Sequence, residues 1–242
     1  MNKTALVIGA TKGIGKSLTE RLLCEGYSVI MTYATDSATA ESVFSSLSLR
    51  FPEHVFLLQA DSGDWSSIDL IVSFVDEHHV MLDVIVFNAG ATDRSSFLSI
   101  HPESWMQIFM VNVHFPTFLL QKIYPYISHG GNVVFTGSLM AIQPHSLSLA
   151  YGVTKAAVHA LVKNLVKFLI EKQVRVNAVA PGFVDTEWQK NKPDEIRHNI
   201  TSKVASGRFC DPEELTDVYM LLINNHYMNG EIVVCDGGYS YQ

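Results

Sequence analysis

The chain has 242 residues, of which 48% are hydrophobic and 17% charged, so it can bury a full core and disorder is not expected. This length favours a single α/β domain spanning residues 1–242. The formal net charge of −7 at pH 7 argues against broad nucleic-acid binding, which needs a basic face.

Short β-branched runs alternate with amphipathic stretches along the whole chain. The runs predicted to be strands are 5–8, 28–33, 55–59, 84–87, 132–136, 174–178 and 231–235. The stretches predicted to be helices are 14–25, 39–49, 65–78, 113–127, 151–171 and 212–224, the last with Asp211 as N-cap and Pro212 in its first turn. Most strands are apolar on both faces, as in a parallel sheet covered by helices on two sides. We therefore predict a Rossmann-like, doubly wound parallel sheet of about seven strands, which binds ligands beyond the carboxyl ends of its strands.

A glycine-rich segment ends the first predicted strand, and a helix follows it. The segment is Gly9-Ala10-Thr11-Lys12-Gly13-Ile14-Gly15. Its glycines allow a tight turn and a close approach of the backbone to a pyrophosphate, and the helix N-terminus offers unpaired N–H groups. The alternative is a plain turn, so the choice depends on the motifs that follow.

Three polar residues form a candidate catalytic group. Ser138 ends the fifth predicted strand, and Tyr151 and Lys155 follow it on one face of a helix. A nearby ammonium favours the phenolate and is expected to lower the tyrosine pKa from about 10. The alternative is a half-exposed tyrosine and a solvated lysine on an ordinary helix. The glycine-rich turn and Asn88-Ala89-Gly90 after the fourth strand favour the catalytic interpretation.

Taken together, these motifs resemble the short-chain dehydrogenase/reductase family over essentially the whole chain, and within it the 3-oxoacyl-acyl-carrier-protein-reductase-like enzymes. The matching pieces are Gly9-x-x-x-Gly13-x-Gly15, Asp61, Asn88-Ala89-Gly90, Asn112, Ser138, Tyr151-x-x-x-Lys155, Pro181-Gly182 and Asp236-Gly237-Gly238. Two departures lie in neighbouring strands, where Ile8 and Phe87 replace the family's usual threonine and asparagine. We hypothesise that an apolar contact there replaces a polar one.

The resemblance implies a role for each catalytic residue. Tyr151 would protonate the carbonyl oxygen as hydride arrives, and Ser138 would hold that oxygen by a hydrogen bond. Lys155 would bind the nicotinamide ribose and lower the pKa of Tyr151. Asn112 would anchor a water that links Lys155 to solvent, and it also reads as a buried amide that stabilises a helix kink.

The resemblance further implies a nicotinamide dinucleotide as cofactor. Its expected contacts are Gly9, Thr11, Lys12, Gly13, Ile14, Gly15, Tyr33, Asp61, Ser62, Asn88, Ala89, Gly90, Tyr151, Lys155, Pro181, Gly182, Val184 and Thr186. Asp61 would accept from the adenine amine. Tyr33 occupies the usual position of the acidic residue of NAD enzymes, and Lys12 would face a 2′-phosphate, so NADP(H) is predicted over NAD(H). Asp36 is expected to lie in a turn and to cap a helix. If the end of the second strand lies further along the chain than Tyr33, Asp36 would instead be the acid that binds the ribose.

The substrate is less defined. Met140, His145, Phe183 and Trp188 are expected to shape its pocket, under a mobile lid formed by 183–206. The leading candidate is a 3-oxoacyl thioester on acyl carrier protein, an acidic partner that needs a basic docking site, for which Lys172 and Arg175 are the candidates. A free small ketone, sugar or sterol is the second candidate. A nucleotide-sensing regulator without turnover is the alternative from another class, but it would be expected to lose Tyr151 or Lys155.

The remaining features concern location and assembly. Of the ten histidines, His78 and His79 are adjacent and have no Glu or Cys at ligand spacing, and the others are scattered singly, so no metal site is expected. The three cysteines lack paired spacing and are expected to be reduced thiols. No apolar run reaches the roughly 20 residues that cross a bilayer, and no signal peptide is recognised, so a cytoplasmic protein without membrane contact is predicted. The resemblance implies a homotetramer, or a homodimer, with helices 113–127 and 151–171 between subunits.

Overall fold

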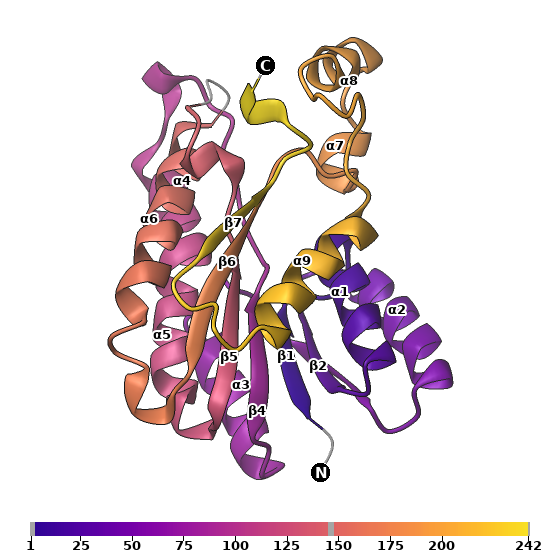
Figure 1. The fold of residues 1–242 in the computed structure, drawn as a ribbon, viewed down its shortest axis with the longest axis vertical. Coiled ribbons are helices and arrows are strands. Elements are labelled where there is room, and N and C mark those ends of the chain that lie inside the picture. Colours follow the sequence, from indigo (N-terminus) through magenta and orange to yellow (C-terminus); the bar gives the residue numbers. More distant parts are fainter. Residues whose placement is uncertain (1–2, 145–147, 242) are drawn as a thin grey trace.

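Seven parallel strands form one sheet in the computed structural model, which describes residues 3–144 and 148–241 (Figure 1). The strands are β1 Thr4–Ile8, β2 Ser28–Tyr33, β3 Val55–Gln59, β4 Leu82–Phe87, β5 Ile127–Thr136, β6 Arg175–Pro181 and β7 Ile232–Cys235. Their order across the sheet is β3-β2-β1-β4-β5-β6-β7. All seven predicted strands are therefore confirmed, and β5 begins five residues earlier than predicted.

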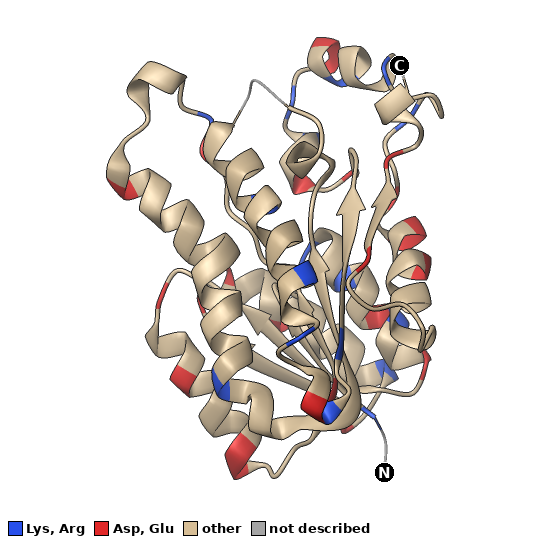
Figure 2. Ribbon diagram, turned by 60° about the vertical axis from the view of Figure 1, so that its left-hand side comes forward, with Lys and Arg blue, Asp and Glu red and all other residues tan. Residues whose placement is uncertain are grey.

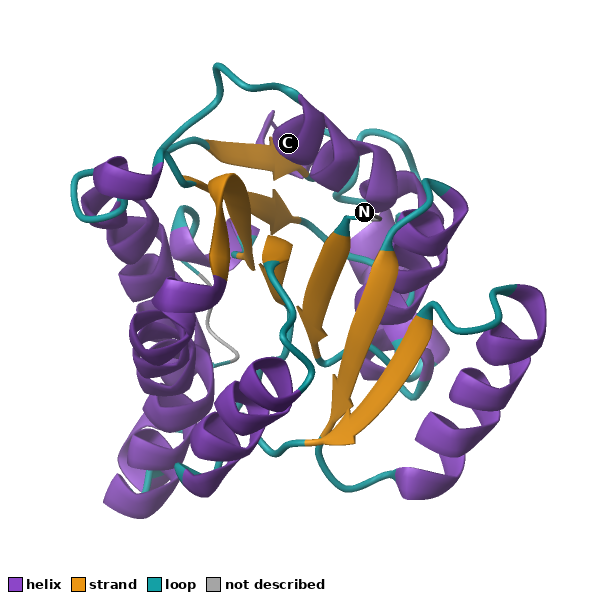
Figure 3. Cartoon of the chain, turned by 90° about the horizontal axis from the view of Figure 1, so that it is seen from below, coloured by secondary structure: helices purple, strands orange, loops and turns teal. Residues whose placement is uncertain are grey.

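Helices cover both faces of this sheet (Figures 1 and 3). They are α1 Gly13–Cys24, α2 Ser37–Arg50, α3 Ser66–Glu77, α4 Pro102–Phe109, α5 Phe115–Ile123, α6 Leu149–Leu165, α7 Glu187–Lys190, α8 Asp194–Thr201 and α9 Pro212–Asn224. The apolar sides of α1, α2 and α9 share one core cluster with the sheet, and those of α3, α5 and α6 share the other. The predicted doubly wound arrangement is confirmed.

The predicted helix 113–127 is the last part of a longer helical segment, except that its final residue, Ile127, begins β5. The segment begins with α4, continues as a π-helix over Met110–His114 and as α5, and ends in a 3-10 turn over Tyr124–Tyr126. Helix α4 was not predicted, although Pro102 at its first position is a typical helix start. Helices α7 and α8 were not predicted either; they lie within segment 183–206, beyond the carboxyl ends of the strands (Figure 1).

The two departures from the family pattern meet in the core. Ile8 and Phe87 are register partners on β1 and β4, and both side chains are buried. The Phe87 ring stacks on Phe135 of β5 with centroids 4.8 Å apart. An apolar contact between the first and fourth strands is therefore present where we hypothesised one.

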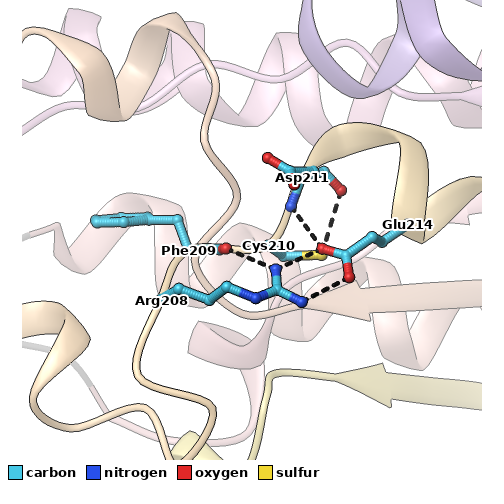
Figure 4. A network of polar contacts seen from close by, with 5 residues as sticks. All are labelled: Arg208, Phe209, Cys210, Asp211 and Glu214. Atoms are coloured by element: carbon cyan, nitrogen blue, oxygen red, sulfur yellow. Dashed lines mark hydrogen bonds and ion pairs between the residues drawn. The ribbon is translucent and has the colours of Figure 1, made fainter.

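A bidentate ion pair stabilises the start of α9 (Figure 4). Asp211 is the N-cap and Pro212 the first residue, as predicted. The Glu214 carboxylate accepts a 2.9 Å hydrogen bond from Asp211 N and two bonds of 2.6 and 2.7 Å from the Arg208 guanidinium. Arg208 and the Asp211 N–H lower the pKa of Glu214 to about 2. Helix α9 is thereby bonded to Arg208, which lies two residues after segment 183–206.

Two further findings concern membrane-spanning helices and the cysteines. In residues 3–144 and 148–241, no helix is both long enough and apolar enough to cross a membrane. Cys24, Cys210 and Cys235 are all free thiols.

Candidate active site

Three predicted catalytic side chains line one cavity of about 520 Å³. Ser138 follows the carboxyl end of β5, and Tyr151 and Lys155 lie one turn apart on α6. Ser148 caps this helix, and its hydroxyl accepts a 3.4 Å hydrogen bond from Tyr151 N. The edge of the sheet and the first turn of α6 together position the three groups.

The Lys155 side chain is buried although it carries an ammonium group. The residue is 3% exposed, and its Nζ donates a 2.6 Å hydrogen bond to the carbonyl oxygen of Thr136. Nζ also lies 5.6 Å from the centre of the Tyr151 ring. Burial lowers the pKa of Lys155 to about 8, because desolvation disfavours the charged form. The alternative of a solvated lysine is therefore wrong.

The pKa of Tyr151 moves in the direction opposite to our expectation. Burial raises it to about 12, and a hydrogen bond with Ser138 only partly offsets that rise. The Lys155 ammonium is directed at the Thr136 carbonyl and does not offset it. In this state the phenol is protonated at neutral pH, which suits a proton donor.

Asn112 lies in the π-helix and joins three parts of the site. Its Oδ1 accepts from Ala91 N at 2.8 Å, and its Nδ2 donates to Ala91 O and to Thr154 Oγ1, both at 2.9 Å. Both amide protons are used. The amide therefore connects the π-helix to the loop after β4 and to helix α6. The structural role predicted for Asn112 is confirmed, and its water-anchoring role stays a prediction.

His159 packs against the backbone of Gly137 and Ser138 and was counted from the sequence among the scattered histidines. It follows Lys155 by one turn of α6 and is 8% exposed. Its Nε2 accepts a long 3.4 Å hydrogen bond from Ser138 N, and a Cβ at Gly137 would lie 2.3 Å from the same atom. Burial, Lys155 and Lys163 lower the pKa of His159 to about 4, so the ring is neutral near pH 7. Its position four residues after Lys155 on the predicted helix could have indicated that it lies near the catalytic residues.

The glycine-rich turn has the form that a bound dinucleotide requires. Gly9 has φ +77°, and a Cβ there would lie 2.9 Å from the Ala89 Cα. A Cβ at Gly15 would lie 2.0 Å from the Gly9 carbonyl oxygen. Helix α1 begins here without a side-chain cap and without an acidic residue in its first turn, which leaves its N–H groups for an anion. The residues present therefore fit the pyrophosphate of a dinucleotide.

Most of the predicted cofactor residues line the same cavity. Those that do are Gly9, Lys12, Gly13, Ile14, Asn88, Ala89, Gly90, Tyr151, Lys155, Pro181, Gly182, Val184 and Thr186. Those outside its lining are Thr11, Gly15, Tyr33, Asp61 and Ser62. Tyr33 ends β2 beside β3, and the Asp61 carboxylate accepts from Gly63 N at 2.8 Å and does not cap α3. The adenine contact assigned to Asp61 and the cofactor contact assigned to Tyr33 stay predictions.

Lys12 makes an ion pair that the sequence did not reveal. Its Nζ contacts the carboxylate of Asp36, which is the N-cap of α2. That carboxylate also accepts from Thr39 N at 3.1 Å and Thr39 Oγ1 at 2.8 Å. Lys12 and Thr39 lower the pKa of Asp36 to about 2. The predicted helix cap is confirmed.

Several segments contribute the end of the cavity where a substrate is expected. Met140, Phe183 and Trp188 line it as predicted, whereas His145 lies outside the described residues. The Trp188 ring meets the Tyr151 ring edge to face with centroids 6.0 Å apart. Further lining residues that the sequence analysis did not identify are Thr92, Arg94, Gln143, Gln189, Lys192 and Tyr239.

The two basic residues suggested for docking an acidic protein are bound to the backbone. The Arg175 guanidinium is buried at the start of β6 and donates to four carbonyls, those of Leu222, Ile223, Asn225 and Met228. Lys172 donates to three carbonyls of residues 124–127. Both lie away from the lining of the cavity, so that suggestion is wrong. Among the described residues, no cluster of His, Cys, Asp and Glu could hold a metal ion.

Comparisons with known proteins show which proteins this chain is similar to. The family described as Enoyl-(Acyl carrier protein) reductase matches residues 9–240. The uncharacterized oxidoreductase YmfI of Bacillus subtilis is 30% identical over 99% of each chain. The 3-oxoacyl-[acyl-carrier-protein] reductase FabG of Thermotoga maritima is 30% identical over 98% of this chain and 97% of its own. A short chain dehydrogenase from Burkholderia cenocepacia, crystallised in complex with NADP, is 26% identical over 98% of each chain, with a TM-score of 0.92.

The neutral His159 makes stability depend on pH. Its pKa is about 4 in the folded protein and near 6.5 in the unfolded chain, so the unfolded chain binds more protons between these values. The free energy of unfolding should therefore fall by about 2–3 kcal/mol as pH falls from 6.5 to 4. His159→Gln keeps an acceptor and removes the titration, so chemical denaturation of this variant should show a flatter profile. Identical profiles for the two proteins would contradict this role.

Proposed function

The chain belongs to the short-chain dehydrogenase/reductase family, an NAD(P)-dependent enzyme family, and on that premise we propose that it reduces a carbonyl group to a secondary alcohol through Ser138, Tyr151 and Lys155. The observation that carries the proposal is that these three side chains and the glycine-rich turn share one cavity. The bound nicotinamide supplies the hydride. The chain's own residues bind the reactants and deliver the proton.

The proton comes from Tyr151 in this proposal. Its phenol is protonated at neutral pH, because burial raises its pKa to about 12, and it is the group that protonates the carbonyl oxygen. Ser138 donates a hydrogen bond to the same oxygen and orients it. The Lys155 ammonium binds the ribose hydroxyls, and its charge stabilises the phenolate that remains after proton transfer. Asn112 Oδ1 keeps one lone pair free, with which it would hold a water on the path from Lys155 to solvent.

Tyr151→Phe removes the transferable proton and little volume. We expect the rate of carbonyl reduction, followed by NADPH absorbance, to fall by about a thousandfold or more. Nucleotide affinity, measured by calorimetry, should stay near that of the wild type. Ser138→Ala is the comparison variant and should lose less, because Tyr151 still polarises the carbonyl. A Tyr151→Phe enzyme that keeps more than about a tenth of the wild-type rate would contradict the assignment.

The substrate that we favour is a 3-oxoacyl thioester, as in the name of the FabG relative from Thermotoga maritima. Acyl carrier protein as its carrier has less support, because Lys172 and Arg175 are bound to backbone carbonyls. A free ketone, sugar or sterol is the second candidate. Because both Tyr151 and Lys155 are present, we do not favour a nucleotide-sensing regulator without turnover.

We further propose that segment 183–206 is the substrate lid. It carries α7 and α8 past the catalytic end of the sheet, and its Trp188 contacts the ring of Tyr151. Assembly as a homotetramer or homodimer through α5 and α6 is supported by exposed apolar side chains on these helices, such as Phe118 and Val153. We place the enzyme in the cytoplasm, as its reduced cysteines suggest.

NADP(H) is the cofactor that we propose. The relative from Burkholderia cenocepacia was crystallised with NADP, and Tyr33 brings no charge to the end of β2. The Asp36 carboxylate is engaged by Lys12 and Thr39, so it is poorly placed to hold a ribose hydroxyl. Lys12 is the cation available to a 2′-phosphate.

A pair of variants tests this preference. The wild type should prefer NADPH over NADH by about ten- to thirtyfold in kcat/KM, and Lys12→Ala should lose most of that factor. Asp36→Asn keeps a helix cap and frees Lys12 from its ion pair, so it should increase the preference for NADPH. A wild-type preference for NADH, abolished by Asp36→Asn, would show instead that Asp36 holds the ribose.

A further inference from the structure

The cavity carries a charge opposite to that of the whole chain. Its described lining contains four basic residues, Lys12, Arg94, Lys155 and Lys192, and one acidic residue, Glu187. The chain as a whole has 24 acidic and 17 basic residues, and both signs are spread over its outer elements (Figure 2). An excess of cations within the cavity of an acidic protein favours anionic ligands.

Two of these cations are already accounted for. Lys12 contacts Asp36 beside the glycine-rich turn, and Lys155 donates to Thr136 O below Tyr151. Arg94 and Lys192 have no such role. Among the described residues, no ion pair includes either of them. Asp93, which precedes Arg94, directs one carboxylate oxygen to Ser95 N and Oγ at 2.9 and 2.7 Å.

Arg94 and Lys192 come from separate segments of the chain that line the same cavity. Burial lowers the pKa of Lys192, and the charges of Arg94 and Arg197 lower it further. Arg197 is compensated by Asp185, whose carboxylate lies 3.1 Å from its guanidinium. Arg94 and Lys192 therefore remain as neighbouring like charges. Such a pair is unfavourable in the free protein, and a bound anion between them would relieve the repulsion.

Both segments flank the Tyr151 end of the cavity. The loop that carries Arg94 is held to the start of α6 by a 3.0 Å hydrogen bond from Thr92 Oγ1 to Ser148 Oγ. Lys192 lies four residues beyond Trp188, whose ring contacts Tyr151. A different part of the lid segment lies next to the glycine-rich turn, where the pyrophosphate is expected. This part is Thr186, whose side chain lies 2.8 Å from a Cβ built on Gly13. An anion at Arg94 and Lys192 would therefore belong to the substrate.

We propose that Arg94 and Lys192 form a subsite for a carboxylate or phosphate group carried by the carbonyl substrate. This inference rests on the proposed reductase function, and it narrows the substrate class to anionic carbonyl compounds. The phosphate of a phosphopantetheine thioester and the carboxylate of a free oxo acid share this chemistry. Neutral ketones, sugars and sterols lack it.

Two matched pairs of substrates test the subsite. One pair is the 3-oxobutanoyl thioesters of 4′-phosphopantetheine and of pantetheine, and the other is 5-oxohexanoate and its methyl ester. For at least one pair, the wild type should prefer the charged member by about tenfold or more in kcat/KM. The pair that shows the preference identifies the source of the anion. The double variant Arg94→Gln/Lys192→Gln should bring the ratio close to one.

Lys190→Gln is the matched control, because Lys190 lies on α7 but outside the described lining of the cavity. It should keep the wild-type ratio. Equal rates for charged and neutral members in the wild type, or an unchanged preference in the double variant, would overturn the subsite. Turnover of the neutral members with no charge preference would overturn it and leave the proposed reductase function intact.

A binding measurement separates the two proposals if no compound is turned over. Calorimetry of the NADP⁺-loaded protein with 4′-phosphopantetheine and pantetheine compares ligands that differ only in the phosphate. Tighter binding of the phosphate form, lost in the double variant, would support the anion subsite even if reduction fails. Equal binding of the two ligands by the wild type would overturn it.

Discussion

The hydrogen bond from the buried Lys155 ammonium to the carbonyl oxygen of Thr136 is the interaction on which the arrangement of the site depends. Moving an ammonium out of water costs several kcal/mol, and the lowered pKa of Lys155 reflects that cost. A hydrophobic side chain would fill the same space without this penalty. The geometry that results places the ammonium 5.6 Å from the Tyr151 ring, at the end of the sheet where ligands bind.

Thr136 also connects this lysine to the glycine-rich turn. Its hydroxyl bonds to Tyr219 OH at 2.6 Å and donates to Asn88 Oδ1 at 3.1 Å. The amide of Asn88 in turn donates to the Gly9 carbonyl at 2.8 Å. One buried network thus joins β1, β4, β5 and α9, because each polar group is satisfied by a neighbour from another element. The proposed catalytic and cofactor-binding parts of the cavity are positioned together.

Much of this could be predicted from the sequence, because it depends on local pattern. The apolar β-branched runs predict the strands, and the spacing of Tyr151 and Lys155 places them on one helix face. The π-helix could not be predicted in this way, since Asn112 distorts it through hydrogen bonds to Ala91, 21 residues away. The contact between Lys12 and Asp36 and the raised pKa of Tyr151 likewise depend on tertiary packing. From the sequence, Arg175 was expected to be a free surface charge. In the structure its guanidinium donates to four backbone carbonyls, which only the tertiary fold brings near it.

Calorimetric titration with NADPH of the wild type and of Lys155→Met, together with denaturation of both proteins, tests most directly whether the buried ammonium serves the ligand and not the fold. Methionine has a similar volume and carries no charge. The account predicts that affinity for NADPH falls by about tenfold or more, while the free energy of unfolding stays the same or rises. Unchanged affinity combined with a marked loss of stability would contradict it, because Lys155 would then be a structural residue.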